Sequence, residues 1–324
     1  MEGPDQRQRI SLTLVTGTLW AADPQPDSGR DYLIADVFTG TPLEGNQLGV
    51  FPDARGMTTD LMQRTTRELN LSESVFFFPA EGGDGDSGGG GDSSGDGDSG
   101  GDAGGGDVRV RIFTPASELP FAGHPCLGAA FVLAERLGKR DITLATGIGP
   151  IRLSFEDDGY GQMEQPIPDF EPYERTEELL DALHLKGSEL PIEAYRNGPR
   201  HVYVGLPDVD AVANLAPDLS RLKEHAAGVN CFAGHGGNWK TRVFVPYLGV
   251  NEDPATGSAA GPLGVHLVRH GQVPFGERIE VSQGAEIGRP STLYVRIDGS
   301  QDSIEHIYVG GYTVVVARGQ YRLS

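Results

Sequence analysis

Hydrophobic and polar residues alternate in short runs along most of the chain, and this pattern predicts a protein built mainly of β-strands. Seven runs rich in β-branched and aromatic residues are predicted strands: residues 32–38, 74–78, 108–113, 201–206, 241–247, 292–297 and 312–319. Helical periodicity is clearest at residues 61–69 and 178–185 and in the segments after His124 and Ser258. The pattern therefore predicts an α+β fold in which sheets dominate.

Two segments, residues 113–138 and 244–271, share one plan. Each begins with an aromatic strand end and a proline, and passes through an acidic residue to Gly-His or Gly-Ser. Each then enters a helix of small residues that ends in basic residues and Gly. An internal repeat of this kind predicts two similarly built halves.

The starts of the two repeated helices are candidate binding sites. We expect His124 and Ser258 to be the N-caps, with Pro262 in the first turn and Gly123 and Gly257 leaving the backbone bare just before the caps. Two helix starts facing each other across a cleft would bind an anion, because each offers unpaired N–H groups and a partial positive charge. A carboxylate is preferred over a phosphate, since GSAAGPL lacks the Lys and Ser or Thr of a P-loop. Close packing of small residues is the alternative.

Composition and charge exclude several classes of protein. The 324 residues carry a net charge of −20 and are 38% hydrophobic, so the chain is large enough for two domains and nonspecific nucleic-acid binding is not expected. No apolar run approaches the length of a membrane span. The two cysteines, Cys126 and Cys231, form neither a disulfide framework nor a CxxC metal pair, and we interpret both as packing residues. A reducing cytoplasm is the expected location.

Two segments fall outside the strand and helix pattern. Residues 1–29 imitate a signal peptide only loosely, because Glu2 and Asp5 cancel the positive start, and we expect a disordered or loosely docked extension. Residues 81–107 contain eight acidic residues and no basic ones among Gly and Ser, which predicts a flexible, dispensable loop. A calcium-binding repeat would need regularly placed apolar residues. The insert is expected to join two neighbouring strands as an overgrown hairpin loop.

Several longer motifs resemble one family. DVFTGTPLEGNQLGVF (36–51), ELNLSES (68–74), RIFTPASELPFAGHP (111–125) and EDPATGSAAGPLGVHLVRHG (252–271) are similar to the PhzF-like proteins of the diaminopimelate epimerase superfamily. MEQPIP (163–168), NGPRHVYVGLP (197–207) and QGAEIGRPS (283–291) resemble the members that act in phenazine biosynthesis. The resemblance runs from about residue 31 to the C-terminus.

The resemblance implies a diaminopimelate epimerase-like fold. Each of two pseudo-repeated domains would wrap a curved, mostly antiparallel sheet around a central helix, with the active site in the cleft between them. The expected domains are residues 30–154, completed by a C-terminal strand at 309–324, and residues 155–308. Family members of this type imply a homodimer that uses no metal or organic cofactor.

The implied activity is an isomerisation. Trans-2,3-dihydro-3-hydroxyanthranilate would be converted to the aminoketone precursor of phenazines by moving a proton from C3 toward C1. An isomerase or epimerase acting on another small amino or hydroxy carboxylic acid is the alternative. Epimerase relatives use two opposed cysteines, whereas here Ala122 and the stretch 253–256 occupy those regions, so diaminopimelate epimerase activity is not expected.

The resemblance also assigns roles to individual residues. Glu73 occupies the position of the catalytic acid/base, which needs a raised pKa to return a proton to carbon. Taken alone, the Ser72-Glu73 pair is indistinguishable from a capping-box fragment or a strand end. His124 and Asp253 would border the same cleft as a supporting pair that orients the substrate or relays protons.

Four further residues are assigned to substrate binding. Ser258, with the amides around Gly123 and Gly257, would hold the substrate carboxylate. Asn46, in the motif EGNQ, is a weaker candidate for lining the site, because it could simply stabilise a turn.

Overall fold

The strands of the first half of the chain are joined in an order that the second half repeats. The computed structural model describes residues 29–80 and 106–323. Its first half contains β1 (Arg30–Val37), β2 (Asn46–Phe51), β3 (Glu73–Pro79), β4 (Val108–Phe113), β5 (Glu118–Leu119), β6 (Asp141–Thr146), β7 (Gly149–Phe155) and β8 (Gly161–Gln165). Two neighbouring pairs, β2–β3 and β4–β6, are parallel. The pairs β1–β2, β3–β4, β6–β7 and β7–β8 are antiparallel.

The second half follows the same order with the same strand directions. It contains β10 (Glu193–Arg196), β11 (Arg200–Gly205), β12 (Gly228–His235), β13 (Asn238–Val245), β14 (Val250–Asp253), β15 (Arg278–Gln283), β16 (Ser291–Gly299) and β17 (Ile304–Gly311). The parallel pairs are β11–β12 and β13–β15, and β14 matches β5 as a short strand on the edge of its neighbour. The predicted duplication is therefore confirmed at the level of topology.

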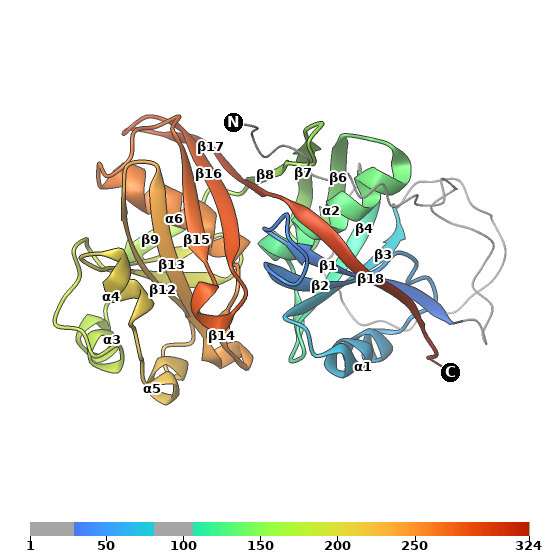
Figure 1. Ribbon diagram of the computed structural model, residues 1–324, viewed down its shortest axis with the longest axis horizontal. Coiled ribbons are helices and arrows are strands. Elements are labelled where there is room, and N and C mark those ends of the chain that lie inside the picture. The colour runs from blue at the N-terminus through green and yellow to red at the C-terminus, as the bar shows by residue number, and fades with distance from the viewer. Residues whose placement is uncertain (1–28, 81–105, 324) are drawn as a thin grey trace, which may run out of the picture.

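The two halves exchange strands. Strand β9 (Asp169–Pro172) follows the first half in sequence but pairs with β10, and β18 (Thr313–Tyr321) follows the second half but pairs with β1. Strands β8 and β17 pair with each other, so the sheet of the first half continues into the sheet of the second half. The sheet and central helix of each half form one lobe of the structure, and Figure 1 shows β17 and β18 running from one lobe into the other. The division into domains at residues 154 and 308 stays a prediction.

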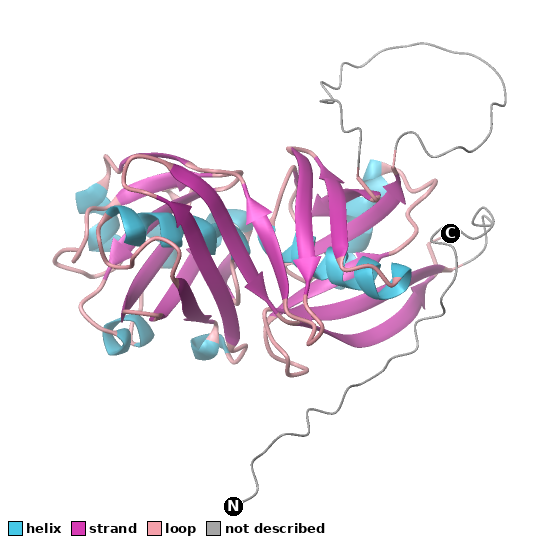
Figure 2. Ribbon diagram, turned by 90° about the horizontal axis from the view of Figure 1, so that it is seen from above, coloured by secondary structure: helices cyan, strands magenta, loops and turns pink. Residues whose placement is uncertain are grey.

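Each lobe wraps its sheet around one long helix, α2 (Gly123–Leu137) or α6 (Gly257–Arg269) (Figure 2). Both helices are buried over most of their surface, as expected of helices that are apolar on every side. Small residues permit this: a Cβ on Gly128 would lie 2.7 Å from Leu48 and Val37, and one on Gly264 would lie 2.6 Å from Val295. The α+β, epimerase-like arrangement predicted from sequence is confirmed.

The remaining helices lie outside the two sheets. They are α1 (Thr59–Leu69), α3 (Thr176–Ala182), α4 (Val209–Ala213), α5 (Leu219–Lys223) and the short 3-10 turns η1 (Pro246–Leu248) and η2 (Ala285–Ile287). No helix in the described part of the chain is long and apolar enough to cross a membrane.

The predicted extension at 1–29 and the insert at 81–107 lie outside the described residues, except for Gly29, Gly106 and Asp107. The strands on either side of the insert, β3 and β4, pair antiparallel, with Pro79 opposite Val108. The prediction that the insert joins two neighbouring strands is therefore confirmed.

Both central helices begin earlier than predicted. The N-caps are Ala122 and Thr256, so His124 and Ser258 are the second residues of their helices. Neither cap residue makes a side-chain cap hydrogen bond: alanine has no polar atom, and the Thr256 hydroxyl donates to Asp253 instead. As a result Pro262 lies inside α6 and not in its first turn, so the prediction of these three positions is wrong.

Candidate active site

Glu73 lies at the start of β3, where the strand emerges beside β2 with Leu48 as its register partner. Its side chain is only 15% exposed and lines a pocket that opens partly to solvent. Both halves of the chain contribute to the pocket: Ser72, Glu73, Thr114, Leu119 and Ala122 from the first, and Pro199, His201, Val245, Tyr247, Leu248, Val250, Asp253, Thr256 and Ser258 from the second. The carboxyl therefore faces a cavity between the lobes.

Asn46, the first residue of β2, is fully buried behind this pocket and does not line it. Its amide nitrogen lies 3.0 Å from Asp253 Oδ1 and 2.9 Å from the carbonyl oxygen of Ala255. The same nitrogen lies 3.3 Å from His124 Nδ1. Asn46 thus fixes the Asp253 turn of the second half against the first half, which is a positioning task.

The imidazole of His124 is buried beside Glu73. Because both amide hydrogens of Asn46 have oxygen acceptors and Nε2 has no hydrogen-bond partner among the described residues, we assign the His124 proton to Nδ1 and the ring's hydrogen bond with the Gln47 backbone to the same nitrogen. Nε2 then keeps its lone pair and lies 3.4 Å from Glu73 Oε2. Neither of these two atoms has a hydrogen-bond partner within the described ranges 29–80 and 106–323. Burial lowers the pKa of His124 to about 3, so the ring is neutral at pH 7.

Two carboxyl groups share the pocket, and their surroundings differ. Burial raises the pKa of Glu73 well above its usual value, and the nearby charge of Asp253 raises it further. Burial also raises the pKa of Asp253, but donors oppose that shift: Thr256 Oγ1 lies 2.5 Å and Asn46 Nδ2 lies 3.0 Å from its oxygens. Hydrogen bonds to a carboxylate favour the charged form, so Asp253 ionises first and Glu73 holds its proton to higher pH.

The two helix starts meet at their glycines. A Cβ on Gly123 would lie 2.6 Å from both the Gly257 carbonyl carbon and the Ser258 amide nitrogen. A Cβ on Gly257 would lie 3.1 Å from the His124 amide nitrogen. The glycines are therefore needed for close packing, which was the alternative interpretation. Ser258 itself lines the pocket, so the amide cluster at the α6 start also borders the cavity.

Buried amide side chains brace the α6 start, and the sequence interpretation missed them. Gln165 Nε2 donates to the Gly257 carbonyl at 2.9 Å, and Asn197 Nδ2 donates to Gln165 Oε1 at 3.3 Å. Gln283 Nε2 donates to the Asp253 carbonyl at 2.7 Å and to Thr256 Oγ1 at 3.0 Å. These residues stand in MEQPIP, NGPRHVYVGLP and QGAEIGRPS, so the motifs were the available signal for this network.

The two cysteines lie away from this chemistry. Cys126 and Cys231 are free and buried, and burial raises the pKa of the Cys126 thiol to about 12 and that of Cys231 higher still. A thiol held neutral in this way cannot act as a base near pH 7. Their interpretation as packing residues agrees with their place in the core.

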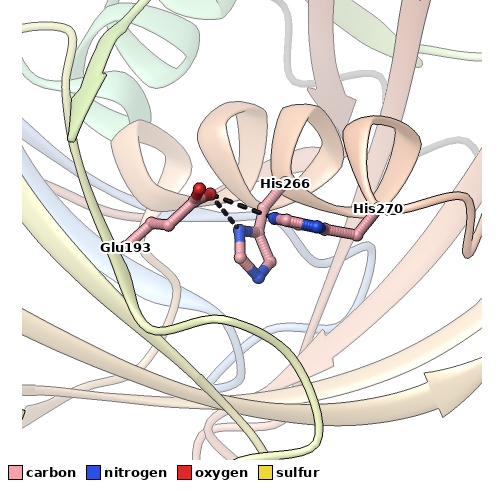
Figure 3. A group of neighbouring side chains, drawn as sticks. All are labelled: Glu193, His266 and His270. Carbon is pink, nitrogen blue, oxygen red and sulfur yellow. Dashed lines mark hydrogen bonds and ion pairs between the residues drawn. The ribbon is translucent and has the colours of Figure 1, made fainter. Parts of the chain in front are cut away.

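One other ionisable cluster has the spacing of a metal site. Among the described residues, Glu193, His266 and His270 place one ligand atom each within 4.8 Å of one another (Figure 3). Glu193 Oε2 is, however, also 2.7 Å from Arg269 Nη1 and 2.7 Å from the Tyr195 hydroxyl. The guanidinium already supplies the positive charge that a metal ion would bring to this oxygen, so we interpret the cluster as an ion-pair network that ties β10 to α6.

Burial of His201 predicts a pH dependence of stability. Its pKa falls to about 4, below the value of about 6.5 in an unfolded chain, so the unfolded state binds more protons between these two values. The stability that neutral His201 contributes to the folded state is fully present above pH 6.5 and is lost as the pH falls toward 4. Urea unfolding measures this loss. The free energy of unfolding of wild type, relative to that of His201→Gln, should fall by about 2 kcal/mol when the pH is lowered from 7.5 to 5. An advantage that stays constant with pH would contradict a neutral, buried His201.

Comparison with known proteins agrees with the fold. The sequence model of the family described as "Phenazine biosynthesis-like protein" matches residues 35–319. The chain is 45% identical over 294 residues to a Pseudomonas aeruginosa protein named trans-2,3-dihydro-3-hydroxyanthranilate isomerase, covering 89% of this chain and 98% of that protein.

Two solved structures share the fold. A Bacillus anthracis phenazine biosynthesis protein of the PhzF family is 25% identical, with a TM-score of 0.74, over 90% of this chain and 99% of that one. A predicted epimerase from Pseudomonas aeruginosa is 30% identical, with a TM-score of 0.71, over 90% and 98% of the two chains. The family match covers most of the described strands and helices. The chain belongs to the phenazine biosynthesis-like (PhzF) family.

Proposed function

We propose that this protein is an isomerase that converts trans-2,3-dihydro-3-hydroxyanthranilate to the aminoketone precursor of phenazines. The observation that carries the proposal is the Glu73 carboxyl, buried in the pocket between the lobes with an oxygen that has no hydrogen-bond partner among the described residues. The similarity over almost the whole length of a relative named for this activity supports the choice of substrate.

The proposed step moves one proton and changes no oxidation state, so its chemistry needs no redox cofactor. Ionised Glu73 takes the proton from C3, and the C3–H electron pair forms the C3–C4 double bond. The ring π electrons shift to the C5–C6 bond, and C1 receives the proton from Glu73. The resulting enol becomes the ketone. A single carboxyl suits both transfers because its raised pKa makes the protonated form accessible near neutral pH.

The neighbours of Glu73 would orient the substrate. The His124 Nε2 lone pair lies 3.4 Å from Glu73 Oε2, behind the residues that line the pocket, and would accept a hydrogen bond from a substrate hydroxyl or amino group that reaches the Glu73 carboxyl. Asp253 keeps a negative charge close by, which attracts a protonated amine and raises the pKa of Glu73. Ser258 and the amides around Gly123 and Gly257 would hold the substrate carboxylate at the two helix starts.

We further propose that the protein works as a homodimer in the cytoplasm. The family resemblance supports the dimer, and two free buried cysteines are compatible with a reducing compartment. Light scattering of the purified chain would measure its mass directly, and a monomer at micromolar concentration would reject the dimer.

The direct test mixes the purified protein with trans-2,3-dihydro-3-hydroxyanthranilate and follows the ultraviolet spectrum. Loss of the diene chromophore at a rate proportional to protein concentration supports the proposal. An unchanged spectrum from a folded protein would reject this substrate and favour another small amino or hydroxy carboxylic acid.

Replacing Asp253 with Asn should shift the pH dependence of turnover to lower pH. The charge of Asp253 raises the pKa of Glu73, so its removal lets Glu73 ionise at lower pH. Asparagine retains one oxygen to accept from Asn46 or Thr256. The measurement is the acid limb of kcat/KM against pH, which reports ionisations of the free enzyme. An acid limb that stays in place or moves to higher pH would contradict the coupling of the two carboxyl groups.

A further inference from the structure

His201 is a buried pocket residue that the sequence interpretation did not single out. It is the second residue of β11, is 2% exposed, and lines the cavity together with Ser258. Its Nε2 lies 3.2 Å from Ser258 Oγ. His201 and Ser258 come from different elements 57 positions apart in the sequence, so the contact joins the sheet of the second lobe to the start of its central helix.

The second ring nitrogen of His201, Nδ1, lies against the backbone of the neighbouring strand β12. Nδ1 is buried without a hydrogen-bond partner among the residues that the structure describes. The atom faces the Cα of Gly228, the residue opposite it in β12, where an added Cβ would lie only 2.4 Å away. A proton on Nδ1 would therefore be a buried donor with no acceptor, which is costlier than an unused lone pair.

This environment fixes the direction of the hydrogen bond. A neutral imidazole carries one N–H, and with Nδ1 unprotonated that N–H is on Nε2 and donates to Ser258 Oγ. The Ser258 hydroxyl has then accepted from His201 and has its own hydrogen free to donate. Because Ser258 borders the cavity, that hydrogen is available to an acceptor on a ligand.

We infer that His201 is a positioning residue that orients the Ser258 hydroxyl as a hydrogen-bond donor to the ligand carboxylate, and so makes the pocket select a carboxylate over a neutral amide. The inference deepens the proposed function and rests on it for the presence of a carboxylate in the substrate. A carboxylate accepts the Ser258 hydrogen as a charged group, and such a hydrogen bond is about twice as strong as one to the carbonyl oxygen of a neutral amide. Selection then comes from a donor that is held ready for a charged acceptor.

Anthranilate and anthranilamide are the probes, because they share a ring and an amino group and differ only in the group that the Ser258 hydroxyl would contact. Calorimetric titration at pH 7.5 should show wild type binding anthranilate more tightly than the amide. His201→Leu should weaken anthranilate binding about tenfold or more, since a hydrogen bond to a charged group is lost, and leave anthranilamide within about twofold. His201→Gln, which places an amide N–H near the position of Nε2, should recover part of the loss.

Tyr203→Phe is the matched control. Tyr203 lies two positions further along β11, and its hydroxyl donates to the Ala259 carbonyl at 2.7 Å, so the variant also removes a buried hydrogen bond between β11 and the first turn of α6. It does not line the pocket, and both probes should bind it as they bind wild type.

Several outcomes would overturn the inference: equal weakening of both probes by His201→Leu, no weakening, no recovery with His201→Gln, or wild type that does not prefer anthranilate. A different result would reject the proposed function. If wild type leaves trans-2,3-dihydro-3-hydroxyanthranilate unchanged while the anthranilate pattern holds, the substrate is wrong and the role of His201 stands.

Discussion

Replacing Glu73 with Gln should lower kcat for the proposed isomerisation about 10³-fold or more and leave the protein folded. Glutamine has nearly the same shape, but it can neither take the proton from C3 nor return one to C1, so both transfers lose their acid/base. The pocket and the contacts among Asn46, His124 and Asp253 do not depend on the Glu73 charge. Substrate binding should therefore change much less than kcat.

The same substitution should not destabilise the protein at neutral pH, and should stabilise it as the pH rises. The pKa of Glu73 in the folded state is raised above its unfolded value, so the folded state binds more protons in the window between the two. Stability from this group is greatest below the unfolded pKa and falls as pH rises through the folded pKa. Glutamine is neutral at every pH, so the variant does not lose stability as the pH rises, because no buried charge forms next to Asp253.

Glu118→Gln provides a matched control for both measured quantities, kcat and the pH dependence of stability. Glu118, on β5, belongs to the same half, pairs with Arg111 at 2.5 Å, and does not line the pocket. Its substitution should leave kcat unchanged. Initial rates and urea unfolding at several pH values measure all three proteins together. If Glu73→Gln keeps more than about a tenth of wild-type kcat, Glu73 is not the acid/base.

The fold could be predicted further than local patterns alone allow, because the two repeated segments disclosed the duplication. Strands with alternating β-branched and aromatic residues, such as β11 and β16, were found from their pattern. Strand β9, with the sequence DFEP, carries no such pattern, and all four of its residues are exposed. Its place is set by pairing with β10 after the crossing between halves, which is a tertiary effect that no local sequence signal encodes.

The burial and contacts of the candidate site could likewise not be predicted from local sequence alone. Glu73 looks like any polar residue at a strand end, and the residues that share its pocket, such as Val250 and Asp253, come from the second half of the chain. His201 sits in an ordinary strand sequence, HVYVGL, and only the packing of α6 places Ser258 against it. Both helix starts were predicted about two residues late. The α2 cap residue, Ala122, has no polar side-chain atom, and the α6 cap residue, Thr256, uses its hydroxyl on Asp253, so neither start follows the usual capping pattern.

Replacing Gly123 with Ala should disrupt both stability and activity. The added Cβ would lie 2.6 Å from two backbone atoms, the Gly257 carbonyl carbon and the Ser258 nitrogen, and no flexible side chain can move aside. The two helix starts must separate, at a cost of about 1–3 kcal/mol for overpacking. Since Ser258 and His124 move with the helix starts, a displacement of even part of an ångström should lower kcat/KM about 10²-fold.

Two further glycine variants separate packing at this contact from the general effect of adding a methyl group. Gly257→Ala meets its nearest atoms at 3.1 Å and should lose less of both activity and stability than Gly123→Ala. Gly187 has no atom within 4 Å of an added Cβ, and Gly187→Ala should be neutral or slightly stabilising, because it restricts the unfolded chain. Thermal unfolding and initial rates of the three variants rank them. Wild-type stability and kcat/KM in Gly123→Ala would mean that the two helix starts can part without harm. The small residues at the helix starts would then not be required for the close approach that brings Ser258 and His124 to one pocket.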